Sequence, residues 1–265
     1  MLRKIVAILL LAVCGFLPEG HTQTVINTED MRLRADTNEL KGSINLDFGM
    51  SRNKAGLFLR PGFDVRLEWS QNQNRWLLLG GYALTRFTDT DIPGASAKTF
   101  NNRGVAHVRY NRSVSGRLTL EAFTQYQFDL VQEIDYRILT GLGPRIKWIQ
   151  AEESFLFTGA SYMFENERTD DEEGGITYNR HHRLSFYASA GINFNEHVNL
   201  NSTTYFQPRP DIWADFRVSS VNSLTANLTD TLGFHMTMNF IYDARPPLSV
   251  SALVFNASAG FTVSW

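Results

Sequence analysis

The sequence has 265 residues and a formal net charge of −2, and 20% of its residues are charged. This balance excludes a polybasic nucleic-acid-binding protein and a disordered chain. No apolar run reaches the ~18 residues of a helical membrane span, but strands that turn every second residue to lipid would not produce such a run.

Residues 1–22 have the features of a secretory signal peptide. Arg3 and Lys4 form a charged start, and Ile5–Leu17 is apolar but too short to span a bilayer as a helix. The single cysteine, Cys14, follows a sequence that faintly resembles a lipoprotein box, but Val13 is large where a small residue is usual, so an ordinary signal-peptide cysteine is the favoured interpretation. Without Cys14 the mature chain has no cysteine, so neither a disulfide framework nor a thiolate site is expected.

Residues 23–39 are polar and without a clear period, and they predict a periplasmic lead-in. From Leu40 onward apolar and polar residues alternate, which is the period of a β-strand. The first strand is predicted over about 40–50. Further alternating segments follow at 57–69, 76–84, 106–110, 118–128, 136–148, 156–164, 184–194, 198–206, 216–228, 232–242 and 252–265.

The length of these segments favours a membrane barrel, because a tilted transmembrane strand needs about 9–11 residues whereas soluble strands average about 5–6. Short turns alternate with links that include the longer segments Asp89–Phe100, Thr169–Asn179 and Arg245–Ser251. We therefore predict one all-β domain over residues 40–265. It is a single antiparallel transmembrane β-barrel of about twelve strands, or ten if two hairpins are misassigned, with short periplasmic turns, longer external loops and both termini in the periplasm.

The last strand ends on an aromatic residue and resembles the closing strand of a bacterial outer-membrane barrel, which the assembly machinery reads. Tryptophans provide a second indication. Four of them fall on the outward parity at the short-turn ends of their strands, as expected of an interfacial girdle in a lipid bilayer. A secreted β-sandwich would not segregate them in this way. The predicted girdle consists of Trp69, Trp76, Trp148 and Trp265.

The residues on the inward parity are strongly polar. A charge facing lipid at mid-membrane would cost about 2–4 kcal/mol, so these charged residues are expected to face the lumen. Two interpretations remain open: the charges cross-link neighbouring strands and fill the barrel, or they line a narrow water-filled path. Since arginines outnumber carboxylates among the inward residues, such a path would mildly prefer anions. The candidate lumen network consists of Arg60, Arg66, Glu68, His107, Arg109, Glu121, Gln125, Arg137, Arg145, Gln207, Arg209 and Arg217.

No sequence motif indicates an enzyme or a cofactor. A lipid-directed hydrolase would need a Ser/His pair on the lipid-facing side, whereas His107 and His235 fall on the inward parity. His181 and His182 follow the acidic run 170–173, and these groups could bind a divalent cation, although a solvated acidic loop is the simpler interpretation. We therefore predict neither a metal site nor a catalytic site.

Several segments across the mature chain resemble domain-of-unknown-function family 481, a bacterial family of salt-induced outer-membrane proteins. The resemblance implies an outer-membrane barrel and no particular activity. It includes Glu121, Gln125, Arg145, Gln207 and Arg209 among its motif positions. The segments are Asn27–Arg34, Gly104–Asn111, Glu121–Phe128, Gly141–Arg145, Thr204–Arg209 and Tyr242–Pro247.

The sequence thus predicts an integral protein of the Gram-negative outer membrane, in contact with the bilayer and with lipopolysaccharide. It would be a structural protein or a narrow solute or ion channel with an arginine-rich lumen. The alternative is a binding or assembly-partner barrel that holds an envelope protein with its loops or with the lead-in.

Overall fold

The computed structural model describes residues 38–263 except 55, 91, 93, 171–174, 230 and 247–249. The predicted signal peptide, the lead-in up to residue 37, most of the acidic run 170–173 and Trp265 lie outside the described residues. No helix in the described part of the chain is long and apolar enough to cross a membrane.

Twelve β-strands account for most of the described chain, as the alternation predicts. They are β1 (Leu40–Asn53), β2 (Gly56–Gln71), β3 (Asn74–Thr88), β4 (Lys98–Ser113), β5 (Leu118–Asp129), β6 (Ile134–Gln150), β7 (Ser154–Asp170), β8 (Ile176–Asn193), β9 (Val198–Pro208), β10 (Phe216–Asn227), β11 (Leu232–Asp243) and β12 (Leu253–Val263).

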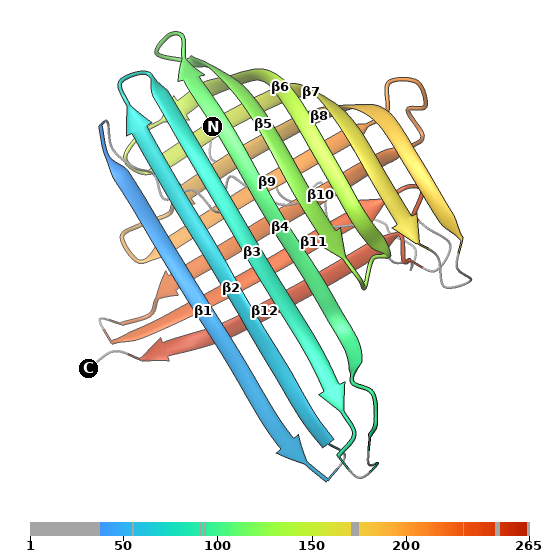
Figure 1. Ribbon diagram of the computed structural model, residues 1–265. Coiled ribbons are helices and arrows are strands. Elements are labelled where there is room, and N and C mark those ends of the chain that lie inside the picture. Colours follow the sequence, from blue (N-terminus) through green and yellow to red (C-terminus); the bar gives the residue numbers. More distant parts are fainter. Residues whose placement is uncertain are drawn as a thin grey trace.

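The strands form one antiparallel sheet in which each strand pairs with its neighbours in sequence, from β1 to β12. The sheet curls so that β9–β12 lie behind β1–β5 (Figure 1). Side chains meet across its hollow, since the Tyr187 hydroxyl on β8 donates to a Glu121 carboxylate oxygen on β5 at 2.7 Å. No pair joins β1 to β12 among the described residues. The architecture is that of a twelve-stranded antiparallel β-barrel.

The two ends of the barrel differ in their connections. At the short-turn end β2 connects to β3, and each later even-numbered strand connects to the next strand. No connection at this end is longer than residues 114–117 between β4 and β5. At the opposite, long-loop end, the connections include 89–97, 209–215 and 244–252. Leu40 of β1 and Val263 of β12 both lie at the short-turn end, because they pair with Trp69 and Leu232.

One predicted loop is wrong in extent. Thr169–Asn179 is expected to be a loop, but β7 continues to Asp170 and β8 begins at Ile176, and Thr169 pairs with Thr177. The strand period continues through these residues, but their polar composition hides it from a search for apolar alternation.

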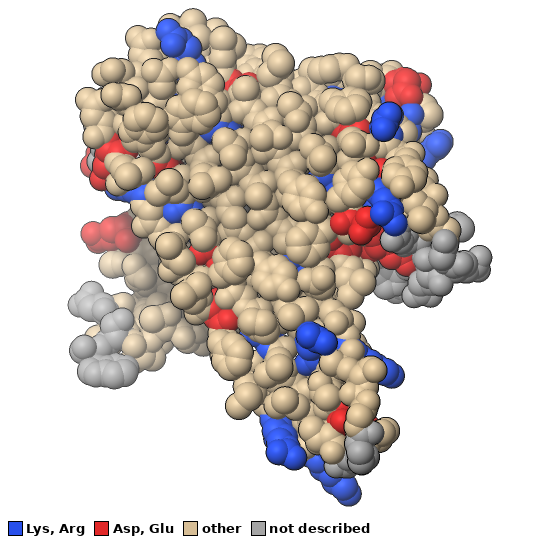
Figure 2. Space-filling view, in the orientation of Figure 1, with Lys and Arg blue, Asp and Glu red and all other residues tan. Residues whose placement is uncertain are grey.

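Most strands turn apolar side chains outward and mainly polar side chains inward, as β6 shows, although β3 buries Leu77 and Leu79 on its inward parity. Ile138 and Leu142 are exposed, Leu142 by 66%, whereas Arg137 and Arg145 on the other parity are buried, Arg137 with only 1% exposed. This is the reverse of a soluble sheet, and it is the pattern of strands that contact lipid outside and a polar lumen inside. Figure 2 shows a largely uncharged outer face over β1–β5.

Three of the four predicted girdle tryptophans can be placed, and all three lie outside. Trp69, Trp76 and Trp148 are 45%, 44% and 56% exposed, and each lies near the short-turn end of its strand. Trp69 pairs with Trp76, whose ring lies 4.6 Å from the Tyr110 ring between centroids. They therefore lie on the outer face and toward the same end of the sheet, as an interfacial belt requires.

Candidate functional site

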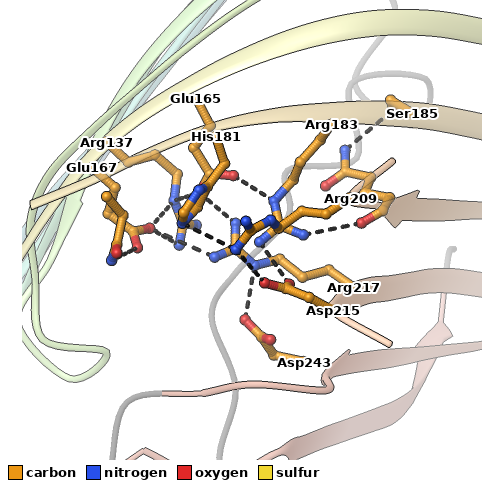
Figure 3. A network of polar contacts seen from close by, with 12 residues as sticks. Arg137, Glu165, Glu167, His181, Arg183, Ser185, Arg209, Asp215, Arg217 and Asp243 are labelled. Atoms are coloured by element: carbon orange, nitrogen blue, oxygen red, sulfur yellow. Dashed lines mark hydrogen bonds and ion pairs between the residues drawn. The ribbon is translucent and has the colours of Figure 1, made fainter. Parts of the chain in front are cut away.

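A buried ion-pair cluster fills the lumen toward the long-loop end, and Glu165 on β7 is at its centre (Figure 3). Its carboxylate accepts hydrogen bonds from Arg183 Nε and Arg217 Nη1, both at 2.6 Å. The Nε of Arg137 lies 3.3 Å from the same group. Glu165 is fully buried, so three guanidinium groups replace the water it has lost.

Further carboxylates complete this arrangement, which we call the Glu165 cluster. Glu167 pairs with Arg137. Asp243 accepts from Arg217 Nε at 2.8 Å, and Asp215 accepts from Arg183 Nη2 at 3.0 Å. Because β6, β7, β8, β10 and β11 all contribute, the cluster cross-links nearly half of the sheet through the lumen.

Arg209 extends the Glu165 cluster into the connection between β9 and β10. Its guanidinium binds Asp215 at 2.9 Å and Asp211 at 2.6 Å. The hydrogen bonds from Arg209 lower the pKa of Asp211 to about 2, and the same carboxylate raises the pKa of Arg209. The cluster therefore reaches from the buried lumen to solvent at the long-loop end.

A second layer closes the middle of the barrel, and we call it the Tyr187 layer. Tyr187 on β8 donates to Glu121 and accepts from Arg145 Nη1 at 3.1 Å. Arg109 and Arg145 each have a guanidinium nitrogen 3.7 Å from the Glu121 carboxylate. The Tyr187 ring lies directly over Gly159, where an added Cβ would come within 2.0 Å of it. Glycine therefore lets the ring pack flat against β7, with its hydroxyl reaching Glu121 on β5.

Little space remains beyond the Tyr187 layer. Nδ1 of His107 lies 3.0 Å from the Gln125 amide oxygen, and Gln125 donates to Gln127 at 2.6 Å. A cavity of only about 30 Å³ lies among these groups and the Tyr187 layer. That is room for about one water molecule, so the described side chains of β4–β9 pack closely here.

On the other side of the Tyr187 layer the lumen is wide. A cavity of about 1020 Å³ lies at the short-turn end, and we call it the vestibule. Arg145 belongs to both the vestibule lining and the Tyr187 layer. The rest of the lining is mainly polar and includes Arg75, Asn111, Arg117, Lys147, Ser189, Asn193, Asn199, Asn201 and Thr203.

The predicted lumen residues fall into three groups. Arg109, Glu121 and Arg145 meet in the Tyr187 layer, with His107 and Gln125 beside it. Arg137, Arg209 and Arg217 belong to the Glu165 cluster, and Gln207 joins it through a carbonyl oxygen that accepts from Arg183 at 3.3 Å. The β2 residues lie apart from both: Glu68 pairs with Arg75 at 3.3 Å, Arg66 is half-buried, and Arg60 is exposed near the long-loop end.

Two carboxylates at the centre of the Glu165 cluster, Glu165 and Glu167, are not among the predicted lumen residues. They continue the inward parity of β7 past Met163, in a segment that ends in the expected loop. When Glu165 and Glu167 are included, buried carboxylates outnumber buried arginines in the described chain, so the predicted arginine excess is absent among the buried residues. The buried charged side chains of the described chain are Arg109, Arg137, Arg145, Arg183 and Arg217 against Glu68, Glu121, Asp129, Glu165, Glu167, Asp215 and Asp243.

The two adjacent histidines are not loop residues. His181 and His182 lie within β8 on opposite faces: His182 Nδ1 is 2.6 Å from the Tyr162 hydroxyl outside, and His181 faces Arg209 inside. No group of three or more potential metal ligands occurs among the described residues. The acidic residues 171–173 lie outside that part.

Strand architecture, apolar exterior and charged interior together define the class, an outer-membrane β-barrel. The chain belongs to the family described as a protein of unknown function, DUF481, whose model matches residues 60–265.

Two solved structures are similar to the chain. One is a NanC porin, with 14% identity, 83% of this chain and 100% of that chain covered, and a TM-score of 0.47. The other is the β domain of the Bordetella autotransporter BrkA, with 13% identity, 84% and 98% covered, and a TM-score of 0.34. No curated protein matches the chain.

Proposed function

We propose that the protein is a narrow outer-membrane channel whose lumen is held closed by the Tyr187 layer and the Glu165 cluster. The carrying observation is the contrast along the lumen: about 1020 Å³ on one side of Tyr187 and about 30 Å³ among the groups on its other side. A barrel that served only as a structural element would gain nothing from a large polar vestibule, whereas a channel requires one.

In this proposal the short turns and both termini are periplasmic, so the vestibule opens toward the periplasm. The long-loop end, with the Glu165 cluster, faces outward among lipopolysaccharide. The last strand is recognised by the assembly machinery. Opening requires Tyr187 to leave Glu121 and Arg145, and a ring that turns on two side-chain torsions can do so more easily than a strand can move.

Planar-bilayer conductance of the refolded protein tests the proposal. We expect the wild-type protein to be closed most of the time and Tyr187→Ala to show frequent, stable openings, because the substitution removes the ring that crosses the lumen. Tyr126→Ala is the matched control, since Tyr126 is a tyrosine on the outer face. If folded Tyr187→Ala is as silent as the wild type, the charged interior is structural and the channel proposal fails.

A further inference from the structure

One wall of the vestibule is basic. Lys147 on β6 and Arg117 in the β4–β5 turn are adjacent, because the Lys147 backbone N–H donates to the Arg117 carbonyl at 2.8 Å. No described carboxylate forms an ion pair with Lys147 or Arg117, although Glu152 and Glu153 of the β6–β7 turn also line the vestibule. Arg75 and Arg145 add two more guanidinium groups, although each already contacts a buried glutamate. Lysine and arginine side chains that line a cavity without partners favour an anionic ligand.

The neighbouring wall, on the far side of β7, carries a ladder of amides from β8 and β9. The Asn201 amide donates to Asn199, the Asn199 amide donates to Asn193, and Asn193 donates to the Glu152 carbonyl at 3.4 Å. Each amide uses one N–H in this ladder, so a second N–H and an oxygen lone pair remain for a ligand. Paired donors and acceptors of this kind suit hydroxyl groups, which both donate and accept.

Phe155 and Phe157 lie between these two walls and line the vestibule. Their ring centroids are 5.6 Å apart. The Arg145 guanidinium covers Phe157 at 4.3 Å, and the Phe155 ring rests against Gly191, where an added Cβ would come within 2.2 Å of it. The ligand site therefore has a small apolar contact area beside its charged and amide walls.

We infer that the vestibule binds a hydroxyl-rich organic anion, about the size of a sugar acid. Its carboxylate would lie against Lys147 and Arg117, its hydroxyls against the asparagine ladder and its C–H face against Phe155. The cavity volume of about 1020 Å³ is at the upper end of small-ligand sites, which span roughly 300–1,000 Å³, so the ligand would enter with water around it.

This inference deepens the proposed function by naming the solute class, but the binding can be measured without any conductance. Calorimetry on the refolded protein would use three probes of similar size: D-glucuronate, D-glucose without the charge, and cyclohexanecarboxylate without the hydroxyls. We expect D-glucuronate to bind at least about tenfold more tightly than either of the others, because it alone uses both walls.

Two variants locate the site. Lys147→Gln and Asn199→Ala should each weaken D-glucuronate binding, by about tenfold for the lysine because a charge-assisted hydrogen bond is lost. Lys54→Gln at the long-loop end is the matched control and should bind like the wild type. Circular dichroism and heat-modifiable migration on gels confirm that each variant is folded.

The outcomes are distinct from those of the channel test. Absence of D-glucuronate binding to folded wild-type protein overturns the inference, whatever the conductance. Equal binding of cyclohexanecarboxylate, or a loss in Lys54→Gln as large as in Lys147→Gln, overturns it too. Selective binding that Lys147→Gln weakens supports it, even if Tyr187→Ala never conducts and the channel proposal has failed.

Discussion

Single residues in this barrel follow the opposite rule from those in a soluble protein, since leucines are exposed and charges are buried. The cost of burying a charge is offset only where its partners are complete. Glu165 meets this condition with Arg137, Arg183 and Arg217 around it. Removing that one carboxylate would leave three guanidinium groups close together with too little counter-charge.

Glu165→Gln should therefore lower the free energy of unfolding by about 3–5 kcal/mol, the cost of breaking a buried ion pair by removing one partner. Urea unfolding of the refolded protein, followed by tryptophan fluorescence, measures this change. Glu196→Gln is the control, because the Glu196 side chain is 86% exposed at a turn. Equal midpoints for the two variants would contradict the role assigned to Glu165.

Gly143 on β6 is a second residue with a sharp expectation. An added Cβ would lie 1.9 Å from the Ala160 carbonyl oxygen and 2.6 Å from the Ser161 Cα, both backbone atoms of β7. Gly143→Ala should then force β6 and β7 apart and reduce the yield of heat-modifiable barrel severalfold on refolding. Gly116→Ala meets nothing within 4 Å and should refold normally. Equal yields would refute the close contact.

Inward placement of single residues can be predicted from parity alone, as Arg137 and Arg145 show. The residues that contact these two arginines cannot be predicted from parity. Tyr187 and Glu121 are far apart in sequence and meet only because the sheet curls, which alternation does not specify. Glu165 was missed for a different reason: Phe164 is the last apolar residue that marks the period of β7, so the predicted strand ends one residue before Glu165.

At the scale of the strand, the apolar alternation was sufficient to predict all twelve elements and their order. Boundaries were less certain where polar residues continue a strand beyond the membrane, as at the ends of β7 and β8. The outward placement of the girdle tryptophans follows from the same parity, and Trp148 Nε1 donates to the Thr158 hydroxyl at 2.8 Å.

Trp69, Trp76 and Trp148 should occupy the same shallow depth in a bilayer. Variants that retain one of the three, with the other tryptophans changed to phenylalanine, can be placed in vesicles of lipids brominated at different acyl positions. We expect the strongest quenching from bromine nearest the headgroup for all three. Strongest quenching by bromine near the chain ends for any of them would contradict the register.

The connection between β9 and β10 should make the thermal stability of the protein depend on pH. Because Arg209 lowers the pKa of Asp211 to about 2 from 3.8, the pair stabilises the fold above about pH 4, and this contribution is lost as the pH falls toward 2. Asp211→Asn should unfold at a lower temperature than the wild type at pH 7 and at the same temperature at pH 2. A difference that persists unchanged at pH 2 would exclude the ion pair as its cause.

At the scale of the whole molecule, the lumen is divided into a wide polar vestibule, a thin closing layer and a dense ionic cluster. The sequence predicts a charged interior and leaves two interpretations open, a polar plug and a narrow water-filled path, with the plug slightly favoured. In the structure a densely packed stretch and a wide vestibule share one barrel, because Tyr187 packs over Gly159 at one level while short polar side chains such as Ser189 and Asn199 leave space at another.

Closure of the lumen at Tyr187 is the central claim. Thiol accessibility tests this closure directly, because Cys14 in the predicted signal peptide is the only cysteine in the sequence and an introduced cysteine can be labelled selectively. Asn201 lines the vestibule, whereas Ser185 lies beyond Tyr187 on β8. We expect a charged methanethiosulfonate to label Asn201→Cys rapidly and Ser185→Cys hardly at all, and to label Ser185→Cys once Tyr187→Ala is added. Equal labelling of both cysteines with Tyr187 present would contradict the closed layer.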